Sequence, residues 1–233
     1  LRKGLREMGV AQNTLVWFMS DNGGLPRLDP PTTGGLRSSK GSMYEGGLRV
    51  PAIIEWPNGI SKVRITKYPA GAVDIFPTIA EVAGLEKSDL LKPQDGMSLA
   101  KLFLKEPGPR QKPLPFRSRG RIAVVDNDYK MISFPNSGKT RYELYNLAND
   151  MSEQDNLVKK EPKIANQLRK KLKAIDASVT ASVNGQDYPE KKVTPQPPRI
   201  FWWERESYRP YFSEWIKRPE YGQRLKRHIE SQK

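Results

Sequence analysis

The residues of this chain best suited to chemistry lie between Asp21 and Lys40. Asp21 and Asn22 follow an apolar run, LVWFM, after one serine, and Lys40 lies in a segment rich in glycine and serine, RSSKGS. Carboxylate and amide oxygens are the ligands that hard cations such as Ca²⁺ and Mg²⁺ prefer. A lysine among glycines and serines suits an oxyanion, because its ammonium is a compact charge that backbone N–H groups can assist. The segment therefore predicts a site for a metal ion and an anion.

Each of these signals has a plainer alternative. Asp-Asn-Gly is also a common turn sequence. The spacing around Lys40 does not match a P-loop, in which Gly-Lys-Ser/Thr opens a helix, so nucleotide binding is not supported. Glu45, before Gly46-Gly47, could act as a base, but the sequence favours a carboxylate that accepts hydrogen bonds from the loop backbone and fixes its shape.

The sequence offers no nucleophile paired with a base. It contains no cysteine, and its single histidine, His228, lies in a basic segment where a solvated side chain is expected. The serine-hydrolase pattern GxSxG and the zinc-protease pattern HExxH are both absent. Composition and spacing alone thus predict half of a catalytic site.

The elements expected to position these residues are two buried strands, at residues 14–20 and 50–56. Both are short, apolar and bounded by turn residues. A helix at residues 1–8 precedes the first strand, a step typical of a doubly wound α/β sheet. In such sheets ligands bind outside the carboxyl ends of the strands, which is where Asp21 and Asn22 stand. Residues 23–42 are expected to form a long functional loop.

Beyond residue 56 the pattern predicts a helix, a proline-rich linker and then a meander. Asp74 suits the N-cap of a helix at residues 74–82, and a shorter helix is expected at 98–104. The prolines between residues 106 and 115 mark a boundary. Three short strands and a helix follow, with apolar residues along one side of the helix. The strands are expected at residues 121–125, 129–134 and 141–145, and the helix, at 162–174, carries the stripe Ile164, Leu168, Leu172 and Ile175.

These elements predict an α/β fold in three segments. Residues 1–115 are expected to form an α/β domain, 116–183 an antiparallel subdomain with a packed helix, and 184–233 a basic, aromatic-rich tail. Aromatic rings among prolines are expected to strap the tail to its own globule, and stacking on bases or sugars is the alternative.

Charge and length limit the possible partners. The chain has 233 residues and a formal net charge of +14, which indicates either a solvated basic surface or a polyanionic partner. No apolar run approaches the ~20 residues that span a bilayer. The first residue is not Met and the first helix has no start signal, so we expect the chain to be the C-terminal piece of a longer protein.

Four segments resemble one known family, the type I sulfatases (arylsulfatase-like), of the alkaline-phosphatase-like superfamily. They occur in the family's order, and the likeness extends over roughly residues 1–177. The segments are SDNGG, LRSSKGSMYEGGLRVPAIIEWPNGI, DIFPTIAEVAGL and YELYNLANDMSEQDNL. The resemblance implies the C-terminal part of an alkaline-phosphatase-like sheet domain, followed by a small subdomain of antiparallel strands and a helix.

The resemblance also implies an activity, the hydrolysis of aryl or carbohydrate sulfate esters. It implies that Asp21 and Asn22 are ligands of a Ca²⁺ (or Mg²⁺) ion and that Lys40 contacts the sulfate group. In this family the nucleophile is a formylglycine made within the motif C/S-x-P-x-R. That motif is absent here, so formylglycine is expected upstream of residue 1 and the isolated chain is expected to be inactive.

The same resemblance sets the expected partners and the rival functions. It implies a sulfate-ester substrate, which could be a sulfated carbohydrate, no nucleic acid, and an extracytoplasmic location. Many phosphatases of the superfamily carry His where this chain has Asn22, so the Asp-Asn pair favours sulfate esters. One rival function is hydrolysis of phosphate or phosphonate esters. The other is non-catalytic binding of a polyanion.

Overall fold

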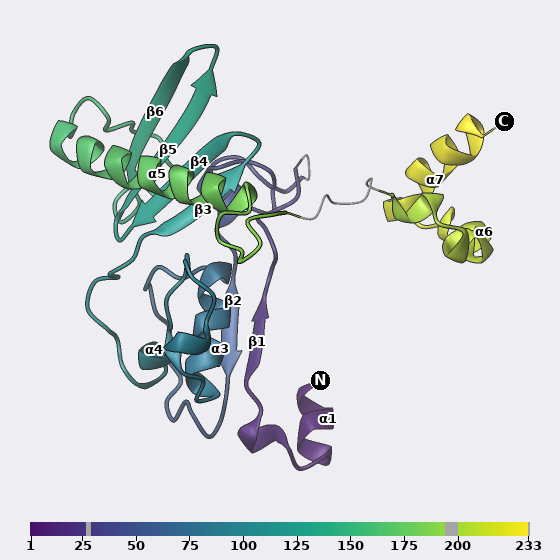
Figure 1. The fold of residues 1–233 in the computed structure, drawn as a ribbon. Coiled ribbons are helices and arrows are strands. Elements are labelled where there is room, and N and C mark those ends of the chain that lie inside the picture. Colours follow the sequence, from purple (N-terminus) through teal and green to yellow (C-terminus); the bar gives the residue numbers. More distant parts are fainter. Residues whose placement is uncertain (27–28, 194–199, 233) are drawn as a thin grey trace. The chain divides into compact units, whose positions relative to one another are not determined.

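The computed structural model of the chain describes residues 1–26, 29–193 and 200–232. Its contacts divide the chain into two compact units, Leu1–Lys191 and Lys192–Lys233, and each is described by itself (Figure 1). The expected segments 1–115 and 116–183 share the first unit. The functional division into three segments stays a prediction.

The first unit opens with two strands that pair antiparallel. β1 (Val16–Met19) lies beside β2 (Ala52–Glu55), so that Val16 faces Glu55 and Met19 faces Ala52. α1 (Arg2–Glu7) and a short 3₁₀ helix, Ala11–Asn13, precede them.

The prediction that these strands are buried is wrong. Phe18 leaves 66% of its surface exposed and Ile53 leaves 64% exposed. The physical reason is that a two-stranded ribbon cannot bury both of its faces without layers packed on each side, and the described residues do not supply them. The strands are also shorter than expected.

A small helical layer follows β2. Its longest helix, α3 (Ile75–Val82), occupies the predicted position, and Gly84 beyond its end has a φ of +76°. α4 (Ala100–Leu104) matches the second expected helix, and 3₁₀ turns are found at Ala72–Asp74 and Lys87–Asp89.

Asp74 does precede α3, but its carboxylate does not cap the helix. It forms a fully buried bidentate ion pair with Arg110 instead, with its Oδ1 2.7 Å from Nη2 and its Oδ2 3.0 Å from Nη1. It also accepts hydrogen bonds from the backbone N–H groups of Gly71 and Met97. Asp74 therefore ties three chain segments together.

A four-stranded antiparallel sheet forms the core of the unit. Its strands follow one another in chain order, which confirms the meander: β3 (Leu114–Ser118), β4 (Arg121–Asp126), β5 (Tyr129–Asn136) and β6 (Lys139–Asn146). β3 was not expected, because its prolines pointed to a linker. It is an edge strand, where Pro115 can be tolerated without a ladder hydrogen bond on its outer side.

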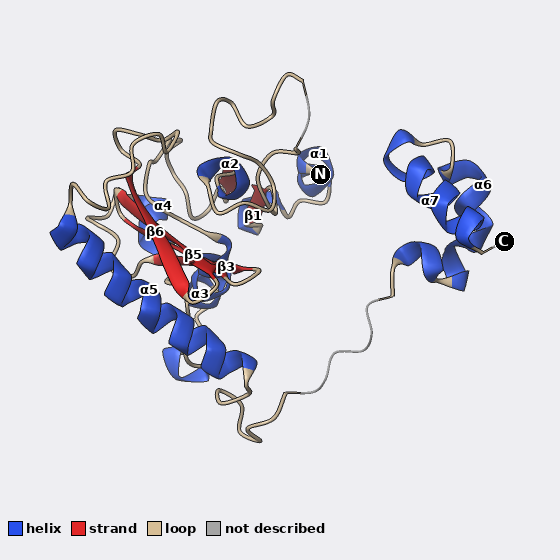
Figure 2. Ribbon diagram, turned by 90° about the horizontal axis from the view of Figure 1, so that it is seen from above, coloured by secondary structure: helices blue, strands red, loops and turns tan. Residues whose placement is uncertain are grey.

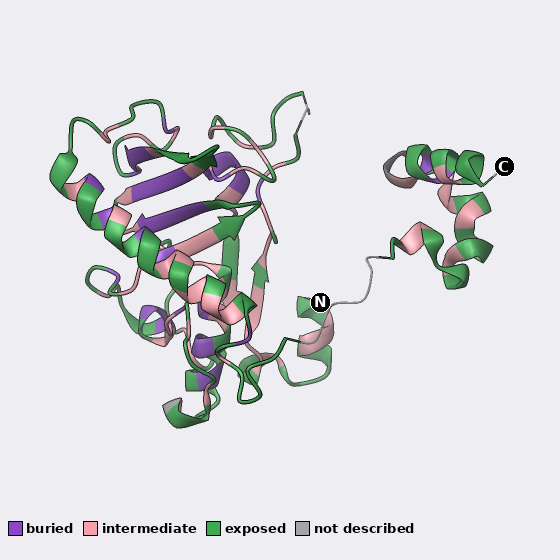
Figure 3. Ribbon diagram, turned by 45° about the horizontal axis from the view of Figure 1, so that its top comes forward, coloured by how far each residue is buried: buried purple, intermediate pink, exposed green. Residues whose placement is uncertain are grey.

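Both faces of this sheet are covered within the chain. α5 (Pro162–Val183) lies along one face, where Leu168 and Leu172 pack on Val124 and Met131 (Figure 2). On the other face Met43 and Tyr44 pack on Ala123, Ile132 and Tyr145. The buried residues therefore concentrate in the sheet and the inner side of α5, whose outer side is exposed (Figure 3). The predicted apolar stripe is confirmed, although the helix is longer than expected.

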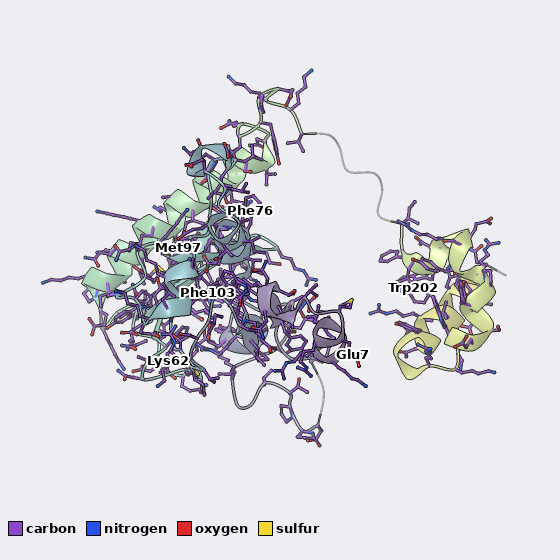
Figure 4. The ribbon with its side chains drawn as sticks, turned by 90° about the horizontal axis from the view of Figure 1, so that it is seen from below. Glu7, Lys62, Phe76, Met97, Phe103 and Trp202 are labelled. Atoms are coloured by element: carbon purple, nitrogen blue, oxygen red, sulfur yellow. The ribbon has the colours of Figure 1, made fainter. Side chains whose placement is uncertain are left out.

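The second unit is a small helical cluster around Trp202. The Trp202 ring lies 5.3–6.4 Å from five other rings, centroid to centroid (Figure 4). The helices are Trp202–Glu204, Glu206–Tyr211, α6 (Phe212–Trp215) and α7 (Pro219–Ser231), and the rings belong to Trp203, Tyr208, Phe212, Trp215 and Tyr221.

This cluster gives the aromatic residues a third explanation. Because the rings pack on one another, they form the core of their own unit. His228 is half-buried and meets the Phe212 ring edge-on at 6.4 Å, so it is not fully solvated as expected. The prolines at 195, 197 and 198 lie outside the described residues. Among the described helices, none has the length and apolar character required to cross a membrane.

Candidate active site

The structure brings Asp21, Asn22 and Lys40 to one open cavity of about 790 Å³. Its walls come from the turn after β1, from residues 32–36 and from the segment that leads into β2. Ligand sites of small molecules usually fall in this range of volume. The three residues singled out in the sequence therefore share one space, and their roles there stay predictions.

The turn that carries Asp21 and Asn22 is pressed against α2 (Glu45–Leu48). The Ser20 hydroxyl donates to the Asn22 carbonyl at 2.8 Å, and the Gly23 N–H donates to the Gly47 carbonyl at 3.0 Å. A Cβ atom at Gly23 would lie 2.1 Å from the Gly46 carbonyl oxygen, so only glycine permits this approach. Asp21 is exposed and Asn22 is half-buried.

Lys40 is tied to the same turn through its backbone. Its N–H donates to the Gly24 carbonyl at 2.8 Å, two residues after Asn22. Gly41, next in the chain, has a φ of +90°, a conformation that glycine adopts at little cost. The Lys40 side chain is exposed. The loop thus places the Lys40 side chain on the cavity, and Lys40 forms no ion pair with any other residue that the structure describes.

Arg49 also lines the cavity, although it was not singled out in the sequence. Its Nε lies 2.6 Å from Glu45 Oε2, and its side chain is 44% exposed. The spacing of Glu45 and Arg49, four residues apart before a strand, is the signal that could have revealed the pair. Arg49 adds a second positive charge to the wall.

Glu45 has partners other than those expected. Its carboxylate binds the side chains of Lys130, at 2.9 Å, and Arg49, and not the loop backbone. Burial alone would raise the pKa of Glu45, but these two cations outweigh it and hold that pKa below its usual value. Glu45 is therefore a buried, ionised anchor and is not placed to act as a base.

Glu153 joins this cluster from the turn after β6. Burial is the main cause that raises the pKa of Glu153 above its usual value, and the nearby charge of Glu45 adds to it. Lys130 and the Glu45 backbone N–H oppose the shift. Sequence reasoning missed Lys130 and Glu153 as neighbours of the candidate site because both come from the antiparallel subdomain.

Asp21 and Asn22 fit a hard divalent cation by the chemistry of their donors. A carboxylate and an amide oxygen are ligands of the type that Ca²⁺ takes, usually six to eight in number. Within residues 1–26, 29–193 and 200–232, no group of three or more His, Cys, Asp or Glu side chains could hold a metal ion. Because Ca²⁺ takes six to eight ligands, Asp21 and Asn22 would supply only part of its coordination shell.

The comparisons with known proteins find similarity to sulfatases. Residues 1–85 match the family model for sulfatases. A sulfatase of Formosa agariphila is 34% identical over 174 residues, which cover 68% of this chain and 31% of that protein. Human arylsulfatase A is 35% identical over 140 residues, covering 56% of this chain and 27% of that protein.

Solved structures show the same fold. The crystal structure of Ps i-CgsB in complex with k-i-k-neocarrahexaose has a TM-score of 0.62 and 27% identity, over 74% of this chain and 38% of that one. A second structure, in complex with its substrate D-glucosamine-2-N,6-O-disulfate, has a TM-score of 0.57 and 22% identity, over 80% of this chain and 38% of that one.

The fold thus has a mixed α/β architecture that resembles the alkaline-phosphatase-like class. Within that class the family match over residues 1–85 and the relatives show that the chain is similar to the type I sulfatases. The chain spans about a third of the length of the curated relatives described above, 31% and 27%.

Proposed function

We propose that the intact protein hydrolyses sulfate esters at the cavity lined by Asp21, Asn22 and Lys40. The observation that carries this proposal is that these three residues share one cavity within the segment, residues 1–85, that matches the sulfatase family model. Their oxygen and ammonium groups suit the two needs of the reaction, a cation site and a charge for the sulfate.

The chain's own residues would stabilise negative charge on the sulfuryl oxygens. Lys40 would contact the sulfate, and Arg49 would add positive charge from the same wall. Charges that are already in place stabilise a transition state better than water does, because water must reorganise around the developing charge and the site does not. Asp21 and Asn22 would hold a Ca²⁺ or Mg²⁺ ion, which, when bound, acts as a Lewis acid on a sulfate oxygen.

The nucleophile is proposed to come from outside this chain. The sequence has no cysteine, and its histidine lies in the C-terminal unit. Family resemblance assigns the nucleophile to a formylglycine, whose motif this sequence does not contain. We therefore propose that residues 1–233 alone are inactive toward sulfate esters.

A sulfated carbohydrate is the substrate class that we propose. Similar structures were solved with a neocarrahexaose and with a disulfated glucosamine. The net charge of +14 would favour the approach of a polyanion. By family resemblance we also place the intact protein outside the cytoplasm.

The proposal is tested by Lys40→Ala in the intact protein, assayed with 4-nitrophenyl sulfate. Losing one charge that contacts the transition state is expected to lower kcat/KM by about 10²-fold or more. Lys62→Ala is the matched control, since Lys62 is exposed and does not line the cavity (Figure 4). Unchanged turnover in Lys40→Ala would exclude the proposed role of Lys40.

The same assay separates the rival functions. Parallel rates on 4-nitrophenyl phosphate and a phosphonate ester distinguish a phosphate-type hydrolase from a sulfatase. A non-catalytic polyanion binder would show neither activity. It would bind heparin in a salt-dependent way and lose that binding when residues 184–233 are deleted.

A further inference from the structure

A buried cluster of three charges lies between the candidate site and the four-stranded sheet. Lys130 Nζ on β5 is 2.9 Å from Glu45 Oε1 and 2.9 Å from Glu153 Oε1. The side chains of Lys130 and Glu153 have no exposed surface, and that of Glu45 is 5% exposed. Burying charges costs free energy that apolar residues would not require. The need to fill space in the core therefore does not explain this cluster.

Glu153 holds the backbone of the Lys40 loop as well as Lys130. Its Oε2 accepts a hydrogen bond from the Glu45 N–H at 2.6 Å, and its carbonyl accepts one from Arg37 Nη1 at 2.7 Å. The guanidinium of Arg37 also lies 3.9 Å above the centre of the Tyr44 ring. Glu153, a residue of the subdomain, thus binds the loop at Arg37 and at Glu45, on either side of Lys40.

Backbone hydrogen bonds connect this part of the loop to the residues that line the cavity. The Gly46 N–H donates to the Arg37 carbonyl at 2.9 Å, which closes the loop. The Gly47 carbonyl then accepts from the N–H of Gly23, which directly follows Asn22, and the Lys40 N–H donates to the carbonyl of Gly24. A displacement of Glu45 would therefore move both the lysine and the proposed metal ligands.

The backbone conformation of Glu153 supports a role in positioning the Lys40 loop. Its φ of 55° lies in the left-handed region, which costs free energy for any residue except glycine. Such conformations persist only where surrounding contacts hold them, and here those contacts are Lys130, Glu45 and Arg37.

We propose that Glu153 and Lys130 are positioning residues that fix the loop 37–47, and with it Lys40, for binding sulfate. The inference rests on the proposed function for the role of Lys40, but the clamp itself exists independently of the reaction. It makes the antiparallel subdomain a working part of the site. A residue more than 100 positions away in sequence then controls the catalytic loop.

Hydrogen exchange of the 233-residue chain tests the clamp without any activity. Glu153→Met removes both the charge and the hydrogen-bond acceptor. It is expected to speed exchange of the amides of Gly23, Lys40 and Gly46 by about tenfold, the change that corresponds to one lost charge-assisted hydrogen bond. Glu153→Gln keeps an acceptor for the Glu45 N–H and is expected to show a smaller increase. This milder variant decides the question if Glu153→Met does not fold.

Leu172→Ala is the matched control, because Leu172 is 4% exposed and packs from α5 against the opposite face of the sheet. It should destabilise the chain without selectively opening the loop. Equal exchange at the three amides in the Glu153 variants and in Leu172→Ala, after correction for global stability, would overturn the proposal.

A kinetic measurement in the intact protein separates this inference from the proposed function. Glu153→Gln is expected to raise KM and lower kcat for 4-nitrophenyl sulfate, and Leu172→Ala to change neither. If the wild type does not hydrolyse sulfate esters but exchange is selective, the function fails and the clamp stands. If Lys40→Ala abolishes hydrolysis but the Glu153 variants match the control, only the clamp fails.

Discussion

The two sheets of the first unit differ in how much of their surface the chain itself covers. Ala123, Val124 and Leu144, in the four-stranded sheet, have no exposed surface. In the β1–β2 ribbon, Phe18 and Ile53 each expose more than half of their surface. A strand stabilises a fold chiefly through the apolar area that it buries. The four-stranded sheet is therefore the stable part of the unit.

The candidate site lies at the less covered sheet and is held by the more covered one. Asp21 and Asn22 follow β1, whereas Lys130 on β5 and Glu153 after β6 hold the loop of Lys40. Under the proposed function, the turn after the ribbon supplies the metal ligands Asp21 and Asn22, and the four-stranded sheet holds the loop that carries Lys40. The variants below test this division of roles.

The largest effect is expected from Lys130→Met. It leaves Glu45 and Glu153 buried without their shared cation, and breaking a buried ion pair in this way costs roughly 3–5 kcal/mol of unfolding free energy. Urea denaturation of the chain measures the loss. Lys139→Met, the same change at an exposed site on β6, is expected to cost less than about 0.5 kcal/mol. Equal losses would show that the cluster does not support the sheet.

Leu168→Ala and Phe18→Ala compare the two sheets directly. Leu168 is 2% exposed between α5 and the four-stranded sheet, and its truncation is expected to cost about 2–5 kcal/mol. Phe18 is mostly exposed, so its truncation should change stability by less than about 0.5 kcal/mol. Thermal or urea unfolding checks both. A comparable loss in Phe18→Ala would mean that the ribbon is as well covered as the sheet.

Gly46→Ala tests the close approach of α2 to the loop of Lys40. A Cβ there would lie 2.2 Å from the Ser38 carbonyl oxygen and 2.5 Å from that of Arg37, so the loop must shift. Overpacking of this kind costs about 1–3 kcal/mol. Gly4→Ala, in α1, meets no atom within 4 Å and should be neutral or stabilise by up to about 1 kcal/mol. Denaturation curves that coincide for both variants would contradict the tight approach at Gly46.

The smallest effect concerns pH. Lys130 and Arg49 outweigh the effect of burial and lower the pKa of Glu45. Its carboxylate therefore stabilises the fold fully at pH values above 4.5, the ordinary pKa of a glutamate. That contribution is lost as pH falls through the lowered pKa. Glu45→Gln is therefore expected to cost about 1.5 kcal/mol at neutral pH and progressively less below pH 4.5. Urea titrations across this range would refute the assignment if the difference grew on acidification.

Local sequence patterns predicted much of the fold, but not its charged contacts. The apolar stripe of α5 and the strands of the meander follow from periodicity alone. β3 was not predicted, because proline is as typical of a linker as of an edge strand. Lys130 stands two residues before Ile132 on β5 and therefore lies on the same face of the sheet, which was a sign that it faces the core. Its partners could not be inferred, since Glu45 and Glu153 lie far away in sequence.

The sequence by itself determined which residues are candidates for the site and where they lie in the chain. Asp21, Asn22 and Lys40 were identified from residue type and local spacing, because strand ends and glycine-rich loops leave local signals. The tertiary structure decided that the three share a cavity, that Glu45 is an anchor, and that Glu153 clamps the loop. The physical reason is that buried charge pairs and the covering of sheet faces are set by contacts between distant segments, which local patterns do not encode.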